Sequence, residues 1–275
     1  MIYLERKPGA ALRPWVRMLW YARGMEFAHQ RERILPTGRA QLILNLARDF
    51  IVDCPEGRPA AWMAPALLVG QRSAYEVVDT SDMADLIGVS FEPGALPVFL
   101  ADAADRVTNG YAALEDVCRG TDPLRDRMRE AQGAEERLGL LEGFLRQRIA
   151  ARLEQRRAGM HPAVHFALGE LKRRPEVARV REVARGTGWS ERRFLEIFRE
   201  EVGFAPKVWC RIQRFQQVVQ QMHGGGEVRW PELALACGFY DQAHLANEFR
   251  AFSGMSPTAY AATHGRVWAN HVRVD

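Results

Sequence analysis

The chain has 275 residues, 47% of them hydrophobic, enough for one large domain or two smaller ones with a sizeable core. No apolar stretch approaches the ~20 residues that span a bilayer, and the segment after Met1 has no apolar signal core. A membrane anchor and a secretory peptide are therefore not expected. Four cysteines lie without paired spacing: Cys54, Cys118, Cys210 and Cys237. We expect reduced thiols in a cytoplasmic protein, with no disulfide framework and no zinc site.

The net charge of +4 is unevenly distributed along the chain. Segment 161–275 holds 16 lysines and arginines and 12 acidic residues, whereas segment 1–160 holds 22 of each. The basic excess thus lies wholly in the last 115 residues. Such an excess suggests a polyanionic partner, although four charges alone do not establish one.

Short β-rich runs occupy residues 1 to about 110. Five runs predict strands: 16–21, 40–46, 66–69, 75–78 and 85–91. Turn-forming residues separate them, as at Pro36-Thr37-Gly38 and Pro93-Gly94. Several short strands at this spacing favour a β-barrel or sandwich. The helical patterns that a parallel β-α fold needs between its strands are missing.

From Pro123 to about Arg157, apolar residues recur every three or four positions, which predicts an amphipathic helix. Its stripe consists of seven large residues: Leu138, Leu140, Leu141, Phe144, Leu145, Ile149 and Leu153. Two interpretations remain open, since the stripe can pack on the chain's own barrel or form a homodimer interface. The width of the stripe favours sharing it between the two.

Residues 155–159 suggest a linker, and helices are expected after it at 161–171 and 206–222. Three glycines at 224–226 break the chain after the second helix, and the tail after Gly265 has no clear signature. The expected division is into a β-rich domain at 1–122, linker or dimerisation helices at 123–158, a helical domain at 159–265 and a tail at 266–275.

A helix-turn-helix pattern occurs twice in the last hundred residues or so, with the copies about fifty residues apart. In each copy a small residue on the first helix allows close approach, a glycine permits the positive φ of the turn, and a polar residue can cap the second helix. These pairs are Ala184 and Ala234, Gly188 and Gly238, and Ser190 and Asp241. Phe194 with Phe198, and Leu245 with Phe249, are spaced i and i+4, so they face the core and leave the opposite face exposed. Two similar surfaces side by side suit the repeating groove of DNA.

The region from Pro162 to Thr263 resembles the DNA-binding domain of the AraC/XylS family of bacterial transcription regulators. The most specific run, Ala236 to Tyr260, is similar to the family signature in its Gly-Phe turn, its Asp-Gln helix start and its closing Gly-x-x-Pro-x-x-Tyr. The resemblance implies two subdomains joined by a long helix, each placing one recognition helix in the major groove. Ala261 departs from the family, in which many members carry Arg after the Tyr.

The resemblance assigns base contacts to early exposed positions of the recognition helices: Arg192, Leu195, Glu196, Ala243, His244 and Asn247. Arg192 could hydrogen-bond guanine, Asn247 adenine and Glu196 cytosine, and Leu195 could meet a thymine methyl. Three further arginines are expected to be phosphate contacts or surface charges: Arg193, Arg199 and Arg250. The alternative for Arg192 and Asn247 is an ordinary solvated face. It weighs more for Glu196, because a carboxylate near phosphates needs a donor.

The first half resembles an AraC-type sensory domain with a cupin-like barrel, at segments 34–46 and 86–95. A barrel cavity could hold a small-molecule effector. Four large aromatics are available to line it: Trp15, Trp20, Trp62 and Tyr75. A cupin enzyme brings several histidines and a glutamate together, whereas this half contains only His29. Neither metal catalysis nor a cofactor is expected, and the His161 and His165 pair is interpreted as a plain helix start.

The sequence thus predicts an α+β protein, with a β-barrel or cupin-like domain and linker helices followed by an all-α domain of two helix-turn-helix subdomains. The predicted function is a sequence-specific DNA-binding transcription regulator of the AraC type that responds to a small-molecule effector. The alternative is a regulator whose first domain serves only dimerisation or protein contacts. An enzyme is not expected, since a repair enzyme needs an activated cysteine and Cys54 has no histidine near it in sequence. Expected partners are double-stranded DNA, a small-molecule effector, a second copy of the chain, and RNA polymerase for an activator, with no membrane.

Overall fold

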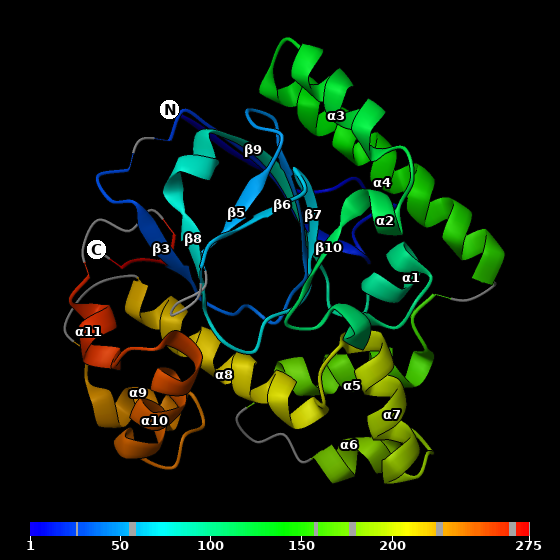
Figure 1. Ribbon diagram of the computed structural model, residues 1–275. Helices are drawn as coiled ribbons and strands as arrows, with labels where there is room; N and C mark the ends of the chain where they lie inside the picture. Colours follow the sequence, from blue (N-terminus) through cyan, green and yellow to red (C-terminus); the bar gives the residue numbers. More distant parts are fainter. Residues whose placement is uncertain are drawn as a thin grey trace.

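The computed structural model describes residues 1–25, 27–54, 59–156, 159–175, 180–223, 228–263 and 268–274. The predicted α+β class is confirmed, because antiparallel sheets dominate the first half and helices the second (Figure 1). The strands curve around a common interior, and the helices of the second half lie beneath one end of it (Figure 1). Among the described residues, no helix is long and apolar enough to span a membrane.

The first sheet has six strands in the order β1-β2-β9-β4-β7-β10. Their bounds are β1 Ile2–Arg6, β2 Val16–Arg23, β4 Gln41–Asn45, β7 Ala66–Val69, β9 Asp85–Phe91 and β10 Tyr111–Ala113. All the pairings are antiparallel. Because side chains alternate between the two faces of a strand, β2 sends Leu19 and Tyr21 into a buried core and turns Trp20 to the interior.

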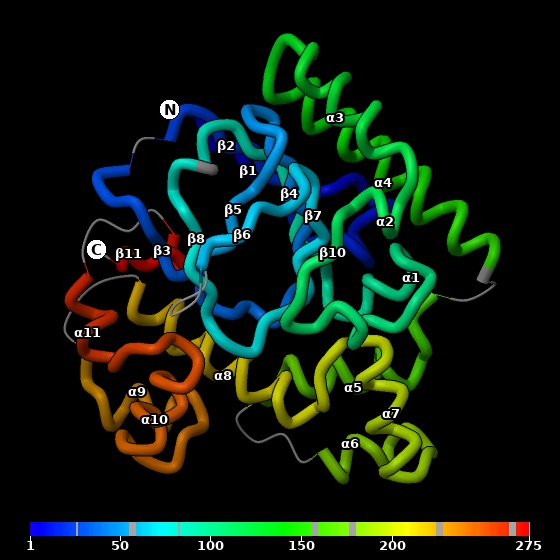
Figure 2. The backbone as a smooth tube through the Cα atoms, in the orientation of Figure 1, coloured from blue at the N-terminus to red at the C-terminus, as the bar shows by residue number. Residues whose placement is uncertain are grey.

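The second sheet has five strands in the order β11-β3-β8-β5-β6. Their bounds are β3 Arg31–Ile34, β5 Ile51–Asp53, β6 Ala61–Met63, β8 Glu76–Asp79 and β11 His271–Arg273. Strand β11 comes from the far end of the chain and lies beside β3 (Figure 2). The two strands pair antiparallel, with His271 opposite Ile34. The tail therefore has a definite structure that its sequence did not indicate, because three residues carry too little pattern.

Two helices, α3 Thr121–Glu130 and α4 Ala134–Arg156, replace the single helix expected from residue 123. Residues 131–133 are not helical and separate the two helices. Leu138, Leu141 and Leu145 are fully buried, and they pack in the same core as β2 and α1, Leu96–Leu100. The stripe thus packs against the chain itself. A dimer stays a prediction, but Leu141 and Leu145 are not its contact residues, because no part of them is exposed.

Short helical turns connect these elements: η1 Thr80–Ala84, η2 Ala104–Val107 and α2 Leu114–Val117. The second half is then built from seven helices of the described residues: α5 Pro162–Arg173, α6 Val180–Gly186, α7 Glu191–Val202, α8 Pro206–His223, α9 Trp230–Ala236, α10 Gln242–Ser253 and α11 Pro257–Ala261. Helix α8 joins the two repeats, as expected for 206–222. One buried core contains both repeats and also Leu35 and Val272, which lie beside the β-rich half.

We expect Leu141→Ala to lower the free energy of unfolding by about 2–5 kcal/mol, because it leaves a cavity in a packed core. Gly139→Ala is the matched control on the same helix, since a Cβ there meets nothing within 4 Å. It should raise the free energy of unfolding by up to ~1 kcal/mol through helix propensity. Urea denaturation measures both. A loss at Leu141 below ~1 kcal/mol would contradict its burial.

Candidate DNA-binding surface and ligand cavity

Each repeat has the turn geometry that its sequence predicts. Gly188 and Gly238 hold φ of 75° and 73°, the left-handed region that favours glycine. The Ser190 hydroxyl accepts a hydrogen bond from the backbone N–H of Arg193 at 3.3 Å, and the Asp241 carboxylate accepts one from the N–H of His244 at 2.7 Å. These bonds cap α7 and α10 and fix where each recognition helix begins.

Helix α7 exposes Arg192, Arg193 and Glu196, while Leu195 is half-buried against the core. The Arg192 Nε donates to the Glu196 Oε1 at 3.0 Å, an i,i+4 pair on the exposed face. Each side chain is therefore the other's nearest charged partner in the free protein. On a surface this open, such a pair is worth only a fraction of a kcal/mol, so either group is available to another partner.

Helix α10 exposes Ala243, Asn247 and Arg250. His244 is half-buried, and its Nδ1 accepts a hydrogen bond from the backbone N–H of Tyr240 at 3.3 Å. Tyr240 itself is 85% exposed. The exposed face of α10 thus carries fewer charged side chains than that of α7. The exposed ring of Tyr240 lies at its edge and was not among the residues predicted from the sequence.

Arg199 faces the β-rich half of the protein. Its Nε lies 3.2 Å from the Asp105 carboxylate on η2. It remains two-thirds exposed. Its charged partner lies on another element, whereas the ion pairs of the described residues include none to Arg193 or Arg250. Sequence pattern could not reveal this pair, because the two residues are 94 positions apart.

The loop between β7 and β8 contacts the end of both recognition helices. Helix α7 ends at Gly203, with φ of 87°, and the Gln71 side chain lies against its Cα. Helix α10 ends at the equivalent Gly254, with φ of 70°, against the ring of Tyr75. The backbone N–H of Tyr75 donates to the carbonyl of Phe252 at 2.9 Å. A single six-residue loop, 70–75, therefore contacts both repeats, each time at the glycine that follows the recognition helix.

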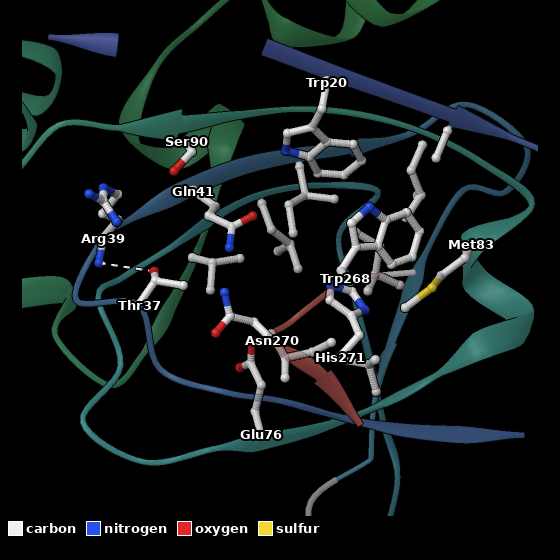
Figure 3. A pocket seen from close by; sticks show the side chains of 18 of the residues that line it. Trp20, Thr37, Arg39, Gln41, Glu76, Met83, Ser90, Trp268, Asn270 and His271 are labelled. Atoms are coloured by element: carbon white, nitrogen blue, oxygen red, sulfur yellow. Dashed lines mark hydrogen bonds between the residues drawn. The ribbon is translucent and has the colours of Figure 1, made fainter. Parts of the chain in front are cut away.

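A cavity of about 530 Å³ lies between the two sheets, in the size range of small-ligand sites. Trp20 lines it, as expected, and so does Met83 (Figure 3). Ile43 and Leu67 add to its apolar wall. The other three aromatics do not line it. Trp15 packs on the core beside α4, Trp62 is 75% exposed and stacks on Phe50, and Tyr75 covers Gly254.

The helical half supplies part of the cavity wall. Gln220 and His223 reach it from α8, and Trp268, Asn270 and His271 reach it from β11 and the residues before it. Gln216, Gln220 and His223 follow the i, i+4, i+7 spacing of one helix face. These residues were not predicted to line the cavity. The three residues of β11 carry too little pattern to predict a strand, and the glutamines of α8 look like an ordinary solvated face.

The tail is held to β3 by a buried carboxylate between two histidines. Glu32 is 5% exposed, and its two oxygens lie 2.8 Å from His29 Nε2 and 2.8 Å from His271 Nδ1. Burial by itself would raise the pKa of Glu32, but the hydrogen bonds and charges of His271 and His29 outweigh it and hold the pKa below its ordinary value. Among the described residues, no group of three or more His, Cys, Asp or Glu side chains is placed so that it could hold a metal ion, and the two histidines instead bond to the carboxylate between them.

Comparison with known families agrees with this geometry. Residues 183–263 match a family of helix-turn-helix domains. The chain carries an AraC-type helix-turn-helix domain. Residues 4–113 match a domain of unknown function (DUF6597). The helical half thus carries a helix-turn-helix domain of a DNA-binding type, and the β-rich half belongs to a different family of domains.

Solved AraC-type structures are similar to the chain at low scores. A transcriptional regulator from Chromobacterium violaceum is 21% identical over 38% of this chain and 96% of its own, with a TM-score of 0.34. An apo variant of ToxT from Vibrio cholerae is 11% identical over 94% of this chain and 96% of its own, with a TM-score of 0.42. Wild-type ToxT with bound unsaturated fatty acid is 12% identical over 94% of this chain and 93% of its own, with a TM-score of 0.40. No curated protein sequence is significantly similar to the chain.

We expect Gly203→Ala to destabilise the protein more than Gly188→Ala. Both glycines hold left-handed backbone, which costs an alanine about 1–2 kcal/mol. A Cβ at Gly188 meets nothing within 4 Å, whereas one at Gly203 overlaps the Gln71 amide and breaks the loop contact. Urea denaturation of the two variants isolates that contact as the difference. Equal losses would show that the loop does not hold α7.

Proposed function

We propose that this AraC-type regulator reads DNA with α7 and α10 and responds to a small-molecule effector bound in the cavity between its sheets. The observation that carries the proposal is the pair of capped helices on one continuous core, each with an exposed face at equivalent positions. Two faces fixed on one rigid unit suit successive turns of the major groove.

Base contacts are proposed for six residues: Arg192, Leu195, Glu196, Ala243, His244 and Asn247. The exposure of Arg192 and Asn247 supports direct contact with guanine and adenine. The pair between Arg192 and Glu196 supports a joint role, in which Arg192 screens the carboxylate from the phosphates while Glu196 accepts from cytosine. Arg193 and Arg250 are proposed as phosphate contacts. Arg199 is proposed as one that first leaves Asp105.

The effector half of the proposal rests on the size and lining of the cavity. The cavity has a volume of about 530 Å³, and most of its lining surface is apolar with polar groups among it. Small-ligand sites usually have this size and this kind of lining. The alternative is a first domain that serves only dimerisation or protein contacts. The apolar stripe of α4 is buried in the chain's own core and is not available for dimerisation, so its burial favours the effector hypothesis over that alternative. A homodimer, contact with RNA polymerase and a cytoplasmic location are parts of the same proposal, as is the division of the chain near residues 122, 158 and 265.

Arg192→Ala and Asn247→Ala should each relax specificity at one operator position, with a loss of about 1–3 kcal/mol there. The two positions should lie about 10 base pairs apart, one turn of DNA. Arg250→Ala is the control, because loss of a phosphate contact weakens all sequences alike and flattens the salt dependence. Selection of sites from a random DNA pool, followed by titration at several salt concentrations, measures all three. The same sequence-independent loss for Arg192→Ala and Arg250→Ala would overturn the assignment, and full-length protein without salt-dependent DNA binding would overturn the function.

A further inference from the structure

Asn270 joins the cavity to the helix that connects the two repeats. Its backbone carbonyl accepts a hydrogen bond from the N–H of Leu35 at 2.8 Å, which fixes the tail on the sheet. Its side-chain Oδ1 accepts from the Gln216 Nε2 on α8 at 2.8 Å, and the same Nε2 lies 2.8 Å from the carbonyl of Pro36. With its oxygen engaged, the Asn270 amide still has two N–H donors, and the side chain points into the cavity (Figure 3).

The acids of the lining are mostly supplied with donors already. Glu5 accepts from the Tyr3 hydroxyl at 2.6 Å, and Glu76 from the Tyr111 hydroxyl at 2.6 Å. Glu76 is also paired with Arg72 at 2.9 Å, and Asp79 accepts from the N–H of Ser81 at 2.8 Å. Asp53 on β5 is the exception, since the hydrogen bonds of the described residues include none to its carboxylate. Three of the four acids are therefore satisfied without a ligand.

Hydrogen-bond donors of the lining, in contrast, include one without an acceptor among the described residues. The Nε of Arg39 is buried and has no hydrogen-bond partner among the described residues. Burial lowers the pKa of Arg39, and Glu92 opposes that shift in part, so the guanidinium charge is costly where it stands. Gln41 and Ser90 lie at the same end of the cavity as Arg39, whereas Trp20, Trp268 and Met83 lie toward the other end (Figure 3).

We propose that the cavity takes a molecule with an apolar body and an anionic, acceptor-rich head, and that both halves of the chain hold it. The body lies between Trp20 and Trp268. The head lies toward Arg39 and Gln41 and meets the N–H groups of the Asn270 amide. An anion there offsets the buried guanidinium and satisfies donors that have no acceptor among the described residues. This inference rests on the proposed effector site and specifies its chemistry.

Regulation follows from the shared wall. A ligand that bonds Asn270 stabilises the arrangement in which β11 is paired with β3 and Gln216 of α8 is held. It therefore favours that arrangement of the two repeats over any in which the tail has left the sheet. Coupling between the ligand and DNA then has equal size in both directions.

Two fluorescent probes of the same ring system test the chemistry: 1-anilinonaphthalene-8-sulfonate, which carries an anionic head, and N-phenyl-1-naphthylamine, which lacks it. We expect the sulfonate to bind the full chain about tenfold more tightly, as a charge-assisted hydrogen bond implies. Asn270→Asp keeps the shape and the acceptor for Gln216 but replaces the donors with a negative charge. It should remove that preference and leave the affinity for the neutral probe unchanged.

Arg273→Ala is the control on the same strand, since Arg273 is exposed and does not line the cavity. It should change neither affinity. If Asn270→Asp weakens both probes equally, or if the neutral probe binds as tightly as the sulfonate to the unaltered chain, the proposed head-group site is wrong. DNA binding measured on the same samples keeps this outcome distinct from a failure of the DNA-binding function.

Hydrogen–deuterium exchange of the full chain tests the coupling. Saturation with the sulfonate probe should slow exchange at least severalfold in peptides that cover β11 and the second half of α8. Peptides that cover α3 lie outside the cavity wall and should be unaffected. Protection confined to the strands of the first half would overturn the shared wall.

Discussion

The placement of the DNA-binding repeats depends on two glycines at the ends of their recognition helices. A helix that ends in left-handed backbone favours glycine, which has no Cβ, and Gly203 and Gly254 stand there at equivalent positions. The missing side chains leave space that the loop 70–75 fills with Gln71 and Tyr75. The residue type that stops each helix is thus also the one that lets the β-rich half approach it. Because β7 and β8 both line the cavity, the loop connects the cavity wall to both repeats.

The two halves are joined by more than this loop. Leu35, from the connection after β3, lies fully buried in the core of the helical half, and Val272 of the tail is buried in the same core. Thr108 donates a hydrogen bond to the carbonyl of Gly203 at 2.9 Å, next to the pair between Arg199 and Asp105. Apolar and polar contacts therefore coexist at this boundary, as they do at interfaces between domains that move relative to one another.

Features set by neighbouring residues were predictable from the sequence, and features set by distant ones were not. The turn glycines, the caps Ser190 and Asp241 and the helix at 206–222 follow from local spacing and were predicted. Five strands were located for the same reason. The three-residue strands were missed, because a pattern with a period of two needs more residues to emerge. The longer strands β1 and β3 were missed as well. The break between α3 and α4 was missed, because the stripe that predicted the helix lies wholly within α4 and carries no signal for the residues before it.

The contents of the cavity wall show the same limit. Alternation along a strand identifies which residues share a face, but it does not say which face is the interior. Trp20 lies on the face of β2 that lines the cavity. Trp15 directly precedes β2 and packs beside α4 instead. Tyr75 was expected in the cavity and instead meets Gly254, a residue 179 positions away. The contribution of α8 and β11 to the wall depends on the tertiary structure, and no pattern of neighbouring residues indicates it.

Strand β11 follows both helix-turn-helix repeats in the chain, yet it forms an edge of the sheet that begins with β3. During synthesis, domains generally fold in the order in which they leave the ribosome. The cavity cannot follow that order, because its wall is complete only after the whole DNA-binding region has emerged. A nascent chain therefore has its first sheet before it has a closed site, and the same small molecule that would bind the finished protein finds no complete site on the unfinished one.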